Sequence, residues 1–312
     1  MIKPLLITGA TGQQGGSAID ALMSSEGANE FMILAVTRNA EGSGVSKLLK
    51  KFPDVRIVVG NLDNVPELFQ EATAIAGQDI WGVYSVQVSM GPGVTLESEV
   101  KQGTDLIAES VRRGVSHFVY SSVERGGDAK SWDNETPVEH FKSKLQIEQY
   151  LRTNAGDMSW TILRPVAFMD NLKPGLASRV FLTAMRDAMH GKVQYWIALS
   201  DIGAFTAKAF LDPKAHDQQA IGLAGDKLTF DELQQVFAKL TAAPPSPSFS
   251  ILGSILKYMV PDLGRMLDWF GTEGYEVDIE SLRRQHSGLK TFERWIKEES
   301  PFHLKNEAMR LV

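Results

Sequence analysis

The chain has 312 residues, of which 43% are hydrophobic and 22% are charged, as is usual for a globular protein. Its net charge of −6 gives no electrostatic reason to expect a nucleic-acid partner. The absence of cysteine excludes disulfides, thiolate metal sites and a cysteine nucleophile, and it fits a reducing compartment. No apolar run reaches membrane-spanning length and the first expected strand begins at once, so we expect a cytoplasmic protein without a signal peptide.

The first sixteen residues have the pattern of a strand, a glycine turn and a helix. An apolar run at 5–7 leads into Gly9, Gly12 and Gly15, and apolar residues then recur at helical spacing from Ala18. Such a turn lets the backbone approach a pyrophosphate, and the helix N-terminus offers it unpaired N–H groups. The first gap is one residue longer than in the common G-x-G-x-x-G pattern. We therefore predict a nucleotide site here, with a purely structural turn as the alternative.

The second expected strand, at 31–37, ends at Arg38. In NAD-binding sheets an acidic residue about 20 residues past the glycine turn binds the ribose 2′-hydroxyl. A guanidinium in this place pairs instead with a 2′-phosphate, in a bidentate manner. Arg38 therefore favours NADP over NAD, and a solvated arginine at a strand end is the alternative.

Strands and helices then alternate along the chain. Further strands are expected at 55–60, 81–86, 115–122 and 160–165, with a helix at 140–152 before the last of them. Asn61 and Leu62 follow the first of these strands, in a loop expected near an adenine, and Gln87 follows the second. The alternation predicts an α/β fold with a Rossmann-type doubly wound parallel sheet and helices on both faces.

Beyond residue 172 the regularity weakens. Short strands are expected at 193–197 and 220–224, and the proline-rich run at 242–248 is the clearest linker. A helical tail follows, whose aromatic residues are expected to form core. We predict an NADP(H)-binding Rossmann domain over 1–170, to which strands from about 193–224 return. A smaller, mostly helical C-terminal domain over 171–312 would bind a substrate or a partner.

Short motifs distributed over the chain together resemble one family. They are the segments 7–15 and 37–39, His140-Phe141-x-x-Lys144, Leu163-Arg164-Pro165, Asp201-Ile202-Gly203, Gly274-Tyr275 and Phe292-x-x-Trp295. This combination resembles the NmrA-like proteins, atypical members of the short-chain dehydrogenase/reductase superfamily. The resemblance covers roughly residues 4–300. Its most specific part is the glycine turn together with His140-x-x-x-Lys144.

The resemblance implies a Rossmann domain that binds NADP(H) and a smaller C-terminal domain, with the site between them. Carried over by position, the pyrophosphate would be held by Gly9, Thr11, Gly12, Gln13, Gln14 and Gly15, and the 2′-phosphate by Arg38. The other contacts would be Asn61 and Leu62 at the adenine, Gln87 on the ribose side, and Lys144 with Val166 to Phe168 at the nicotinamide end.

The helix at 140–152 bears on whether the protein is an enzyme. Reductases of the superfamily carry Tyr-x-x-x-Lys here, so that the proton-donating tyrosine and the lysine share one helical face. This chain keeps Lys144 but has His140 in place of the tyrosine. A histidine can donate a proton near neutral pH, but we favour a structural His140 and a Lys144 that serves only cofactor binding. Serines at 121 and 122 occupy the usual place of the catalytic serine, and Tyr84 or Tyr120 could act if either faced the cleft.

Two functions remain open. Members of the family studied as regulators sense redox state by binding NADP(H) and contacting partner proteins, whereas others are described as reductases. The missing tyrosine favours a redox sensor or a transcriptional or signalling regulator, in the cytoplasm or the nucleus, whose loops at 90–94 or 124–135 respond to the cofactor. The alternative is an NADPH-dependent reductase of a small carbonyl, imine or enone. We expect a regulatory protein partner or a small-molecule substrate, and no metal, membrane or direct nucleic-acid contact.

Overall fold

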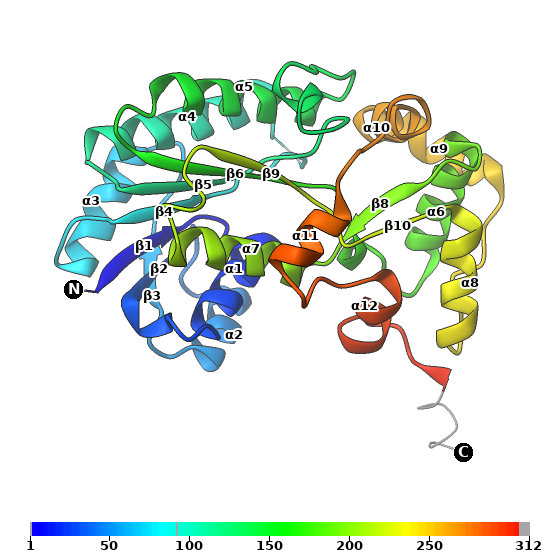
Figure 1. Cartoon of the computed structure of the whole chain (residues 1–312), viewed down its shortest axis with the longest axis horizontal. Coiled ribbons are helices and arrows are strands. Elements are labelled where there is room, and N and C mark those ends of the chain that lie inside the picture. The colour runs from blue at the N-terminus through cyan, green and yellow to red at the C-terminus, as the bar shows by residue number, and fades with distance from the viewer. Residues whose placement is uncertain (1, 92, 306–312) are drawn as a thin grey trace. The chain divides into compact units, whose positions relative to one another are not determined.

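The computed structural model describes residues 2–91 and 93–305 (Figure 1). The chain divides into two units, each assembled from three segments. The first unit contains residues 1–123, 142–164 and 202–221, and the second contains 124–141, 165–201 and 222–312. Pro92, within the loop at 90–94, lies outside the described residues.

The first unit is built on a seven-stranded sheet with the order β3-β2-β1-β4-β5-β6-β9 (Figure 1). Its strands are β1 (Lys3–Ile7), β2 (Phe31–Thr37), β3 (Arg56–Val59), β4 (Gly82–Ser85), β5 (His117–Ser121), β6 (Ser159–Pro165) and β9 (Gln219–Leu223). The pairings from β3 through β6 are all parallel. The strand order reverses between β1 and β4, where doubly wound sheets bind ligands at the carboxyl ends of their strands. The predicted Rossmann-type α/β fold is confirmed.

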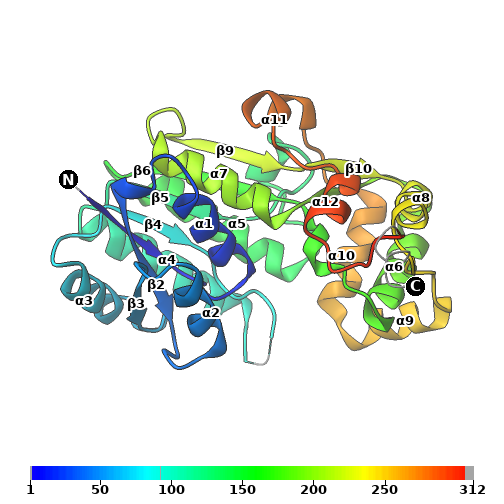
Figure 2. The same ribbon diagram turned by 90° about the horizontal axis from the view of Figure 1, so that it is seen from below.

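Helices cover both faces of this sheet (Figures 1 and 2). They are α1 (Gln13–Met23), α2 (Ser43–Lys51), α3 (Val65–Ala76), α4 (Leu96–Arg112), α5 (Glu139–Asn154) and α7 (Leu199–Leu211). Helices α1, α2 and α7 lie on one face, and α3, α4 and α5 on the other. A Cβ at Gly203 would lie 2.3 Å from the carbonyl oxygen of Ser17, so this glycine lets α7 approach the backbone of α1.

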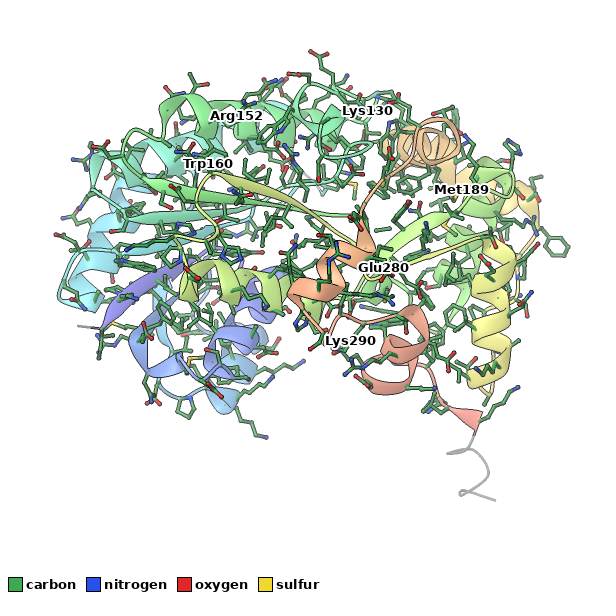
Figure 3. The ribbon with its side chains drawn as sticks, in the orientation of Figure 1. Lys130, Arg152, Trp160, Met189, Glu280 and Lys290 are labelled. Carbon is green, nitrogen blue, oxygen red and sulfur yellow. The ribbon has the colours of Figure 1, made fainter. Side chains whose placement is uncertain are left out.

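The buried and exposed side chains follow this layering. Leu5, Leu6 and Ile7 of the central strand are completely buried, as a strand covered on both faces requires. Figure 3 shows the contrast between Trp160, which is buried on β6, and Arg152, which is exposed near the end of α5. The sheet therefore forms a rigid apolar core. The polar groups of a functional site must come from the ends of its strands and the starts of its helices.

The first residue of β5, His117, is completely buried and neutral. Its Nδ1 lies 2.9 Å from the Ser159 hydroxyl and its Nε2 lies 3.2 Å from the Thr161 hydroxyl. Burial lowers the pKa of His117 to about 4 from the usual 6.5. Because the folded pKa is depressed, the neutral ring contributes its full stability above pH 6.5 and loses it as the pH falls toward 4.

We therefore expect acid to weaken the fold through this one histidine. Between pH 6.5 and pH 4 it should remove about 3 kcal/mol from the free energy of unfolding. Urea unfolding at several pH values, compared between the wild type and His117→Asn, isolates this contribution from the carboxylates. His303→Gln, an exposed control, should keep the full wild-type slope. Parallel pH curves for the wild type and His117→Asn would contradict the prediction.

The second unit contains a three-stranded sheet with the order β10-β8-β7. Its strands are β7 (Ala167–Phe168), β8 (Gln194–Ile197) and β10 (Asp226–Leu228). Strand β8 pairs in parallel with β7 and antiparallel with β10. The expectation that the strand at 193–197 returns to the Rossmann sheet is therefore wrong, whereas the strand expected at 220–224 is β9 of that sheet. Apolar periodicity reveals a strand, but it does not reveal the partner of that strand.

Aromatic side chains form the core of the second unit. Its helices are α6 (Leu176–Met189), α8 (Phe230–Leu240), α9 (Ser250–Met259), α10 (Pro261–Thr272), α11 (Ile279–Gln285) and α12 (Phe292–Glu298). The Phe292 ring lies 5.6 Å from that of Trp196 and 5.5 Å from that of Phe237, both edge-on. Trp295 is also fully buried. The aromatic tail is core, as the sequence predicts.

Candidate functional site

The glycine turn between β1 and α1 is packed so closely that Gly9 and Gly15 have no room for side chains. Gly9 has a φ of +59°, and a Cβ there would lie 2.8 Å from Cγ1 of Val86. The Gly12 N–H donates to the Gly9 carbonyl at 2.8 Å and closes the turn. A Cβ at Gly15 would lie 2.3 Å from that same carbonyl oxygen. Helix α1 therefore starts directly against the end of β1.

The start of α1 is open to an anion. Gly12 is the N-cap and supplies no side-chain cap, and the first turn carries no acidic residue. Thr11 and Gln13 are exposed at this end, and Gln14 is half-buried. Free N–H groups and the positive end of the helix dipole are the features that bind phosphate groups. The turn can therefore hold a pyrophosphate.

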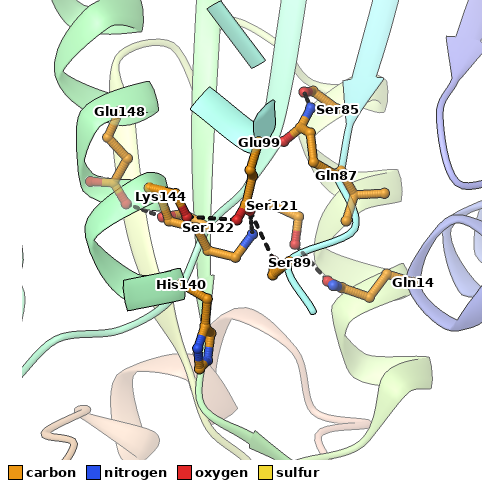
Figure 4. Close-up of polar contacts among 12 residues, drawn as sticks. Gln14, Ser85, Gln87, Ser89, Glu99, Ser121, Ser122, His140, Lys144 and Glu148 are labelled. Atoms are coloured by element: carbon orange, nitrogen blue, oxygen red, sulfur yellow. Dashed lines mark hydrogen bonds and ion pairs between the residues drawn. The ribbon is translucent and has the colours of Figure 1, made fainter. Parts of the chain in front are cut away.

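The side chain of Gln14 connects this turn to the end of β5. The hydroxyl of Ser121, which is completely buried, donates to Oε1 of Gln14 at 2.5 Å (Figure 4). Tyr84 and Tyr120 are both completely buried in the neighbouring strands. Burial raises the pKa of Tyr84 to about 12, although the nearby hydroxyls of Ser121 and Thr206 work against it. Both tyrosines are core residues with no surface exposed to a substrate.

The adenine end carries Arg38 at the carboxyl end of β2. Arg38 is exposed, and no hydrogen bond or ion pair engages it within residues 2–91 and 93–305. Asp63, two residues beyond Asn61, accepts hydrogen bonds from Gln102 at 2.7 Å and from Asn61 at 2.8 Å. These bonds, together with the charges of Lys101 and Arg38, lower the pKa of Asp63. Leu62, between Asn61 and Asp63 in the sequence, is half-buried.

Gln87, after the carboxyl end of β4, presents an unused acceptor. Its side chain is buried, and its amide nitrogen donates to the Ser85 hydroxyl at 2.9 Å (Figure 4). Its Oε1 has no hydrogen-bond partner among the described residues. A buried acceptor without a donor is costly, and a ribose hydroxyl would satisfy it.

Lys144, on α5, is held by a carboxylate that the sequence analysis missed. Its ammonium lies 3.1 Å from Oε1 of Glu99, on α4, and both side chains are buried (Figure 4). The hydroxyl of Ser89 donates to the same Glu99 oxygen at 2.9 Å, and that of Ser143 donates to Oε2 at 2.6 Å. Glu99 lies on the buried face of α4 with Gly103, Leu106 and Ile107. That i, i+4, i+7 spacing is the signal that could have identified it.

A second buried ion pair lies one turn further along α5. Arg164 on β6 donates to Glu148 at 2.7 Å, and both side chains are completely buried. The hydroxyl of Ser122 also donates to Glu148. Ser122 is therefore part of the contact between α5 and the sheet, whereas Ser121 faces the glycine turn.

His140 lies in the first turn of α5, within the second unit, and is tied to Asp262. Oδ1 of Asp262 accepts the Glu139 N–H at 2.8 Å, and Oδ2 contacts Nδ1 of His140. Arg265 reaches Oδ1 at 3.0 Å. Burial opposes ionisation of Asp262, but its contacts with His140, Glu139 and Arg265 hold its pKa well below the usual range. Asp262 thus caps α5, and this gives His140 a structural part in that cap.

The residues carried over to the nicotinamide end do not lie in one unit. Lys144 belongs to the first unit, whereas Val166 and Phe168 belong to the second. Val166 is buried and donates its N–H to the Leu223 carbonyl at 3.2 Å, and Phe168 is half-buried in β7. Within the first unit, the glycine turn and Gln87 follow the carboxyl ends of β1 and β4, and Lys144 lies in the second turn of α5.

The loop at 124–135 begins with a carboxylate that ties it down. Glu124 is completely buried and accepts the N–H groups of Gly126 and Glu276, each at 3.1 Å, and that of Gly127. The Ser131 hydroxyl donates to it at 3.1 Å. Burial raises the pKa of Glu124, and these donors partly offset the shift. The loop is held by hydrogen bonds within it and by one from the backbone of Glu276.

The described residues contain neither a membrane-spanning helix nor a cluster of metal ligands. None of their helices combines the length and apolar character needed to cross a membrane. No group of three or more histidine, aspartate or glutamate side chains is placed to hold a metal ion in this part of the chain.

A parallel sheet in this strand order, with a glycine turn opening its first helix, defines a Rossmann-type protein. Within that class, the pattern of the NmrA-like family matches residues 1–296, so the chain belongs to this family. The sequence is 24% identical over 319 residues to the NmrA-like family domain-containing oxidoreductase lnaB of Aspergillus flavus, covering 92% of each chain. It is 23% identical to an NmrA-like family domain-containing protein of Dictyostelium discoideum, covering 95% of this chain and 98% of the other.

Solved structures share the fold. Triphenylmethane reductase of Citrobacter sp., complexed with NADP(H), superposes with a TM-score of 0.70 at 19% identity, over 95% of this chain and 99% of that one. The NADPH-dependent quinone oxidoreductase QOR2 of Escherichia coli, complexed with NADPH, gives a TM-score of 0.66 at 17% identity, over 94% and 98% of the two chains.

Proposed function

We propose that this protein is an NADPH-dependent reductase. The observation that carries the proposal is a set of groups in the first unit. The open glycine turn, Arg38 and Gln87 follow the ends of β1, β2 and β4, and Lys144 lies on α5. Among the described residues, Arg38 has no ion pair and Oε1 of Gln87 has no hydrogen-bond donor. Its relatives include named oxidoreductases, and similar folds were solved with NADP(H) or NADPH. The cysteine-free sequence supports a reducing compartment such as the cytoplasm.

The described residues fit the dinucleotide. Gly9, Gly12 and Gly15 leave room for the pyrophosphate, and the start of α1 supplies N–H donors to it. Arg38 pairs with the 2′-phosphate, and Oε1 of Gln87 accepts from a ribose hydroxyl. The Lys144 ammonium has three donors, of which the described residues engage one through Glu99, so donors remain for the nicotinamide ribose. When bound, NADPH would supply a hydride from its nicotinamide ring.

A regulator that only senses NADP(H) is the second candidate. The observation in its favour is the contact between His140 and Asp262. His140 occupies the position of the usual proton donor, and this contact makes it part of the cap of α5. A partner protein would be expected in that case. One acceptor that is reduced with stoichiometric loss of NADPH would exclude a purely sensing role.

The choice of cofactor tests the role of Arg38. The wild type should bind NADPH more tightly than NADH, and Arg38→Ala should lose about 1–3 kcal/mol of binding to NADPH alone. Arg56→Ala is the matched control, because Arg56 is exposed at the opposite, amino end of β3 and bonds the Ile75 carbonyl. Calorimetric titrations with both cofactors measure the effect. Equal affinities of the wild type for NADPH and NADH would disprove the assignment.

A further inference from the structure

We propose that the protein pairs with a second copy of itself through the exposed apolar face of α9. The inference does not depend on the proposed reduction, because every residue that carries it lies in the second unit. It follows from the area of this face, from the packing behind it and from the charges beside it.

One face of α9 exposes large apolar side chains, which we call the α9 stripe. Ile251, Ile255 and Tyr258 recur at i, i+4 and i+7, so they lie on the same side of the helix. Met259 follows on the same side, and all four side chains are exposed. Two more exposed apolar residues, Phe249 and Val260, flank the helix at its two ends.

The area of this surface matches one side of a stable dimer interface. Tyr258 is 87% exposed and Phe249 is 79% exposed. A large side chain offers about 200 Å² when it is fully exposed, so the stripe and its two flanks present on the order of 800 Å². The largest apolar patch on a monomer usually covers about 300–600 Å², whereas a standard interface buries about 800 Å² on each partner.

The opposite face of α9 is already packed against α6 and α10 (Figure 1). A Cβ at Gly253 would lie 3.1 Å from the Cα of Ala184, so this glycine lets α9 approach α6 closely. On α10, a Cβ at Gly264 would lie 2.9 Å from the Lys257 carbonyl oxygen. Because both approaches fix the inner side of α9, the stripe cannot turn inward without breaking them. It therefore needs a partner beyond these two helices.

The charges beside the stripe favour a second copy over a membrane surface. Lys257 is the only charged residue of α9, and it pairs with Asp268 of α10. Arg186 of α6 pairs with Asp187 at 2.7 Å and donates to the Ser250 hydroxyl at 3.1 Å. A helix that binds lipid head groups carries many basic residues on its polar face. Neutral ion pairs instead form the polar rim of a protein interface, and they do not repel an identical face.

The order of residues along the stripe suits an antiparallel pair. A twofold axis at Ile255 sets this residue against its own copy, and it sets Ile251 against Met259 of the second copy. Side chains of similar size then meet across the axis. The antiparallel arrangement also brings opposite ends of the two helix dipoles together, which is the favourable alignment.

Sedimentation velocity of the full chain from about 1 to 200 μM measures this association. The wild type should pass from monomer to dimer, and Ile255→Asp should weaken the association at least about 10²-fold, because symmetry places the new charge in the interface twice. Ile2→Asp is the matched control, since Ile2 is 51% exposed against 46% for Ile255 but belongs to the first unit. About 1 M NaCl should leave the dimer intact, because no ion pair holds it.

The cysteine-free sequence allows a second experiment, which reports the arrangement of the two helices. On oxidation, Ile255→Cys should form a disulfide-linked dimer, whereas Ile251→Cys and Met259→Cys should link only when they are mixed. In the antiparallel pair each of these two positions lies about 12 Å along the helix from its own copy, and a disulfide spans at most about 7 Å between Cα atoms. Non-reducing gels measure the products, even if Ile255→Asp fails to fold.

Four outcomes would overturn the inference. The first two are a wild type that is monomeric at every concentration and a dimer that Ile255→Asp leaves intact. The third is Ile251→Cys that links to itself but not to Met259→Cys, which excludes the antiparallel pair. The fourth is a monomer that sediments with vesicles of phosphatidylcholine and phosphatidylserine unless it carries Ile255→Asp, which assigns the stripe to a membrane. None of these results depends on NADPH, so the proposed function is tested separately.

Discussion

Gly15→Ala is expected to abolish NADPH binding and to lower the free energy of unfolding by about 3 kcal/mol, whereas Gly16→Ala is expected to do neither. The Cβ at position 15 would lie 2.3 Å from the Gly9 carbonyl oxygen and 2.7 Å from that of Thr8. Both contacts are with backbone, so α1 would have to move away from β1. This movement of α1 would also open the turn that should receive the pyrophosphate.

Gly16 provides the matched control on the same helix. Its nearest atom to a new Cβ would be the Ala10 carbonyl oxygen at 3.6 Å, an ordinary contact. Alanine there should stabilise α1 slightly, because glycine is a poor helix former. Thermal melts with and without NADPH, together with calorimetric titration, compare the two variants. If Gly15→Ala bound NADPH normally, the pyrophosphate would not be held at this turn.

Arg164→Met is expected to destabilise the protein by about 3–5 kcal/mol, because it leaves the Glu148 charge buried without its counter-ion. Both side chains are completely buried, so water cannot replace the lost partner. Urea unfolding at pH 7 measures the loss. Arg112→Met, which breaks the pair of an arginine whose side chain is 63% exposed, should change little.

A double variant identifies the cause of this loss. Glu148→Leu combined with Arg164→Met removes both charges, and it should recover most of the stability lost in the single variant. The hydroxyl of Ser122 then loses its acceptor, so recovery should be incomplete. A double variant as unstable as the sum of its single changes would show that packing, rather than the unpaired charge, sets the cost.

The fold of the first unit could be predicted from patterns of residues that are adjacent in the sequence. The turn at Gly9, Gly12 and Gly15 could be identified because a strand, a turn and a helix are adjacent in sequence. The alternation of strands and helices then restricts the sheet to a few orders, because parallel crossovers follow the same hand. The observed order is that of the doubly wound sheet that the sequence predicts.

Distant pairings could not be read in the same way. Lys144 and Glu99 are 45 residues apart, and His140 and Asp262 are 122 apart. Each pair joins two helices whose contact depends on the folded chain, so no spacing rule predicts it. The spacing of the residues around position 99 could have shown that it faces the core, but only the structure shows that it meets Lys144.

The two buried ion pairs on α5 also constrain how this protein can evolve. Lys144 and Glu148 are one helical turn apart, and their partners are on different elements, α4 and β6. Exchanging either pair for apolar residues requires a step in which one buried charge has lost its partner. That step costs about 3–5 kcal/mol out of a total stability of about 5–15 kcal/mol. Single-mutation paths away from these charges are therefore costly, and we expect the two members of each pair to change together across lineages.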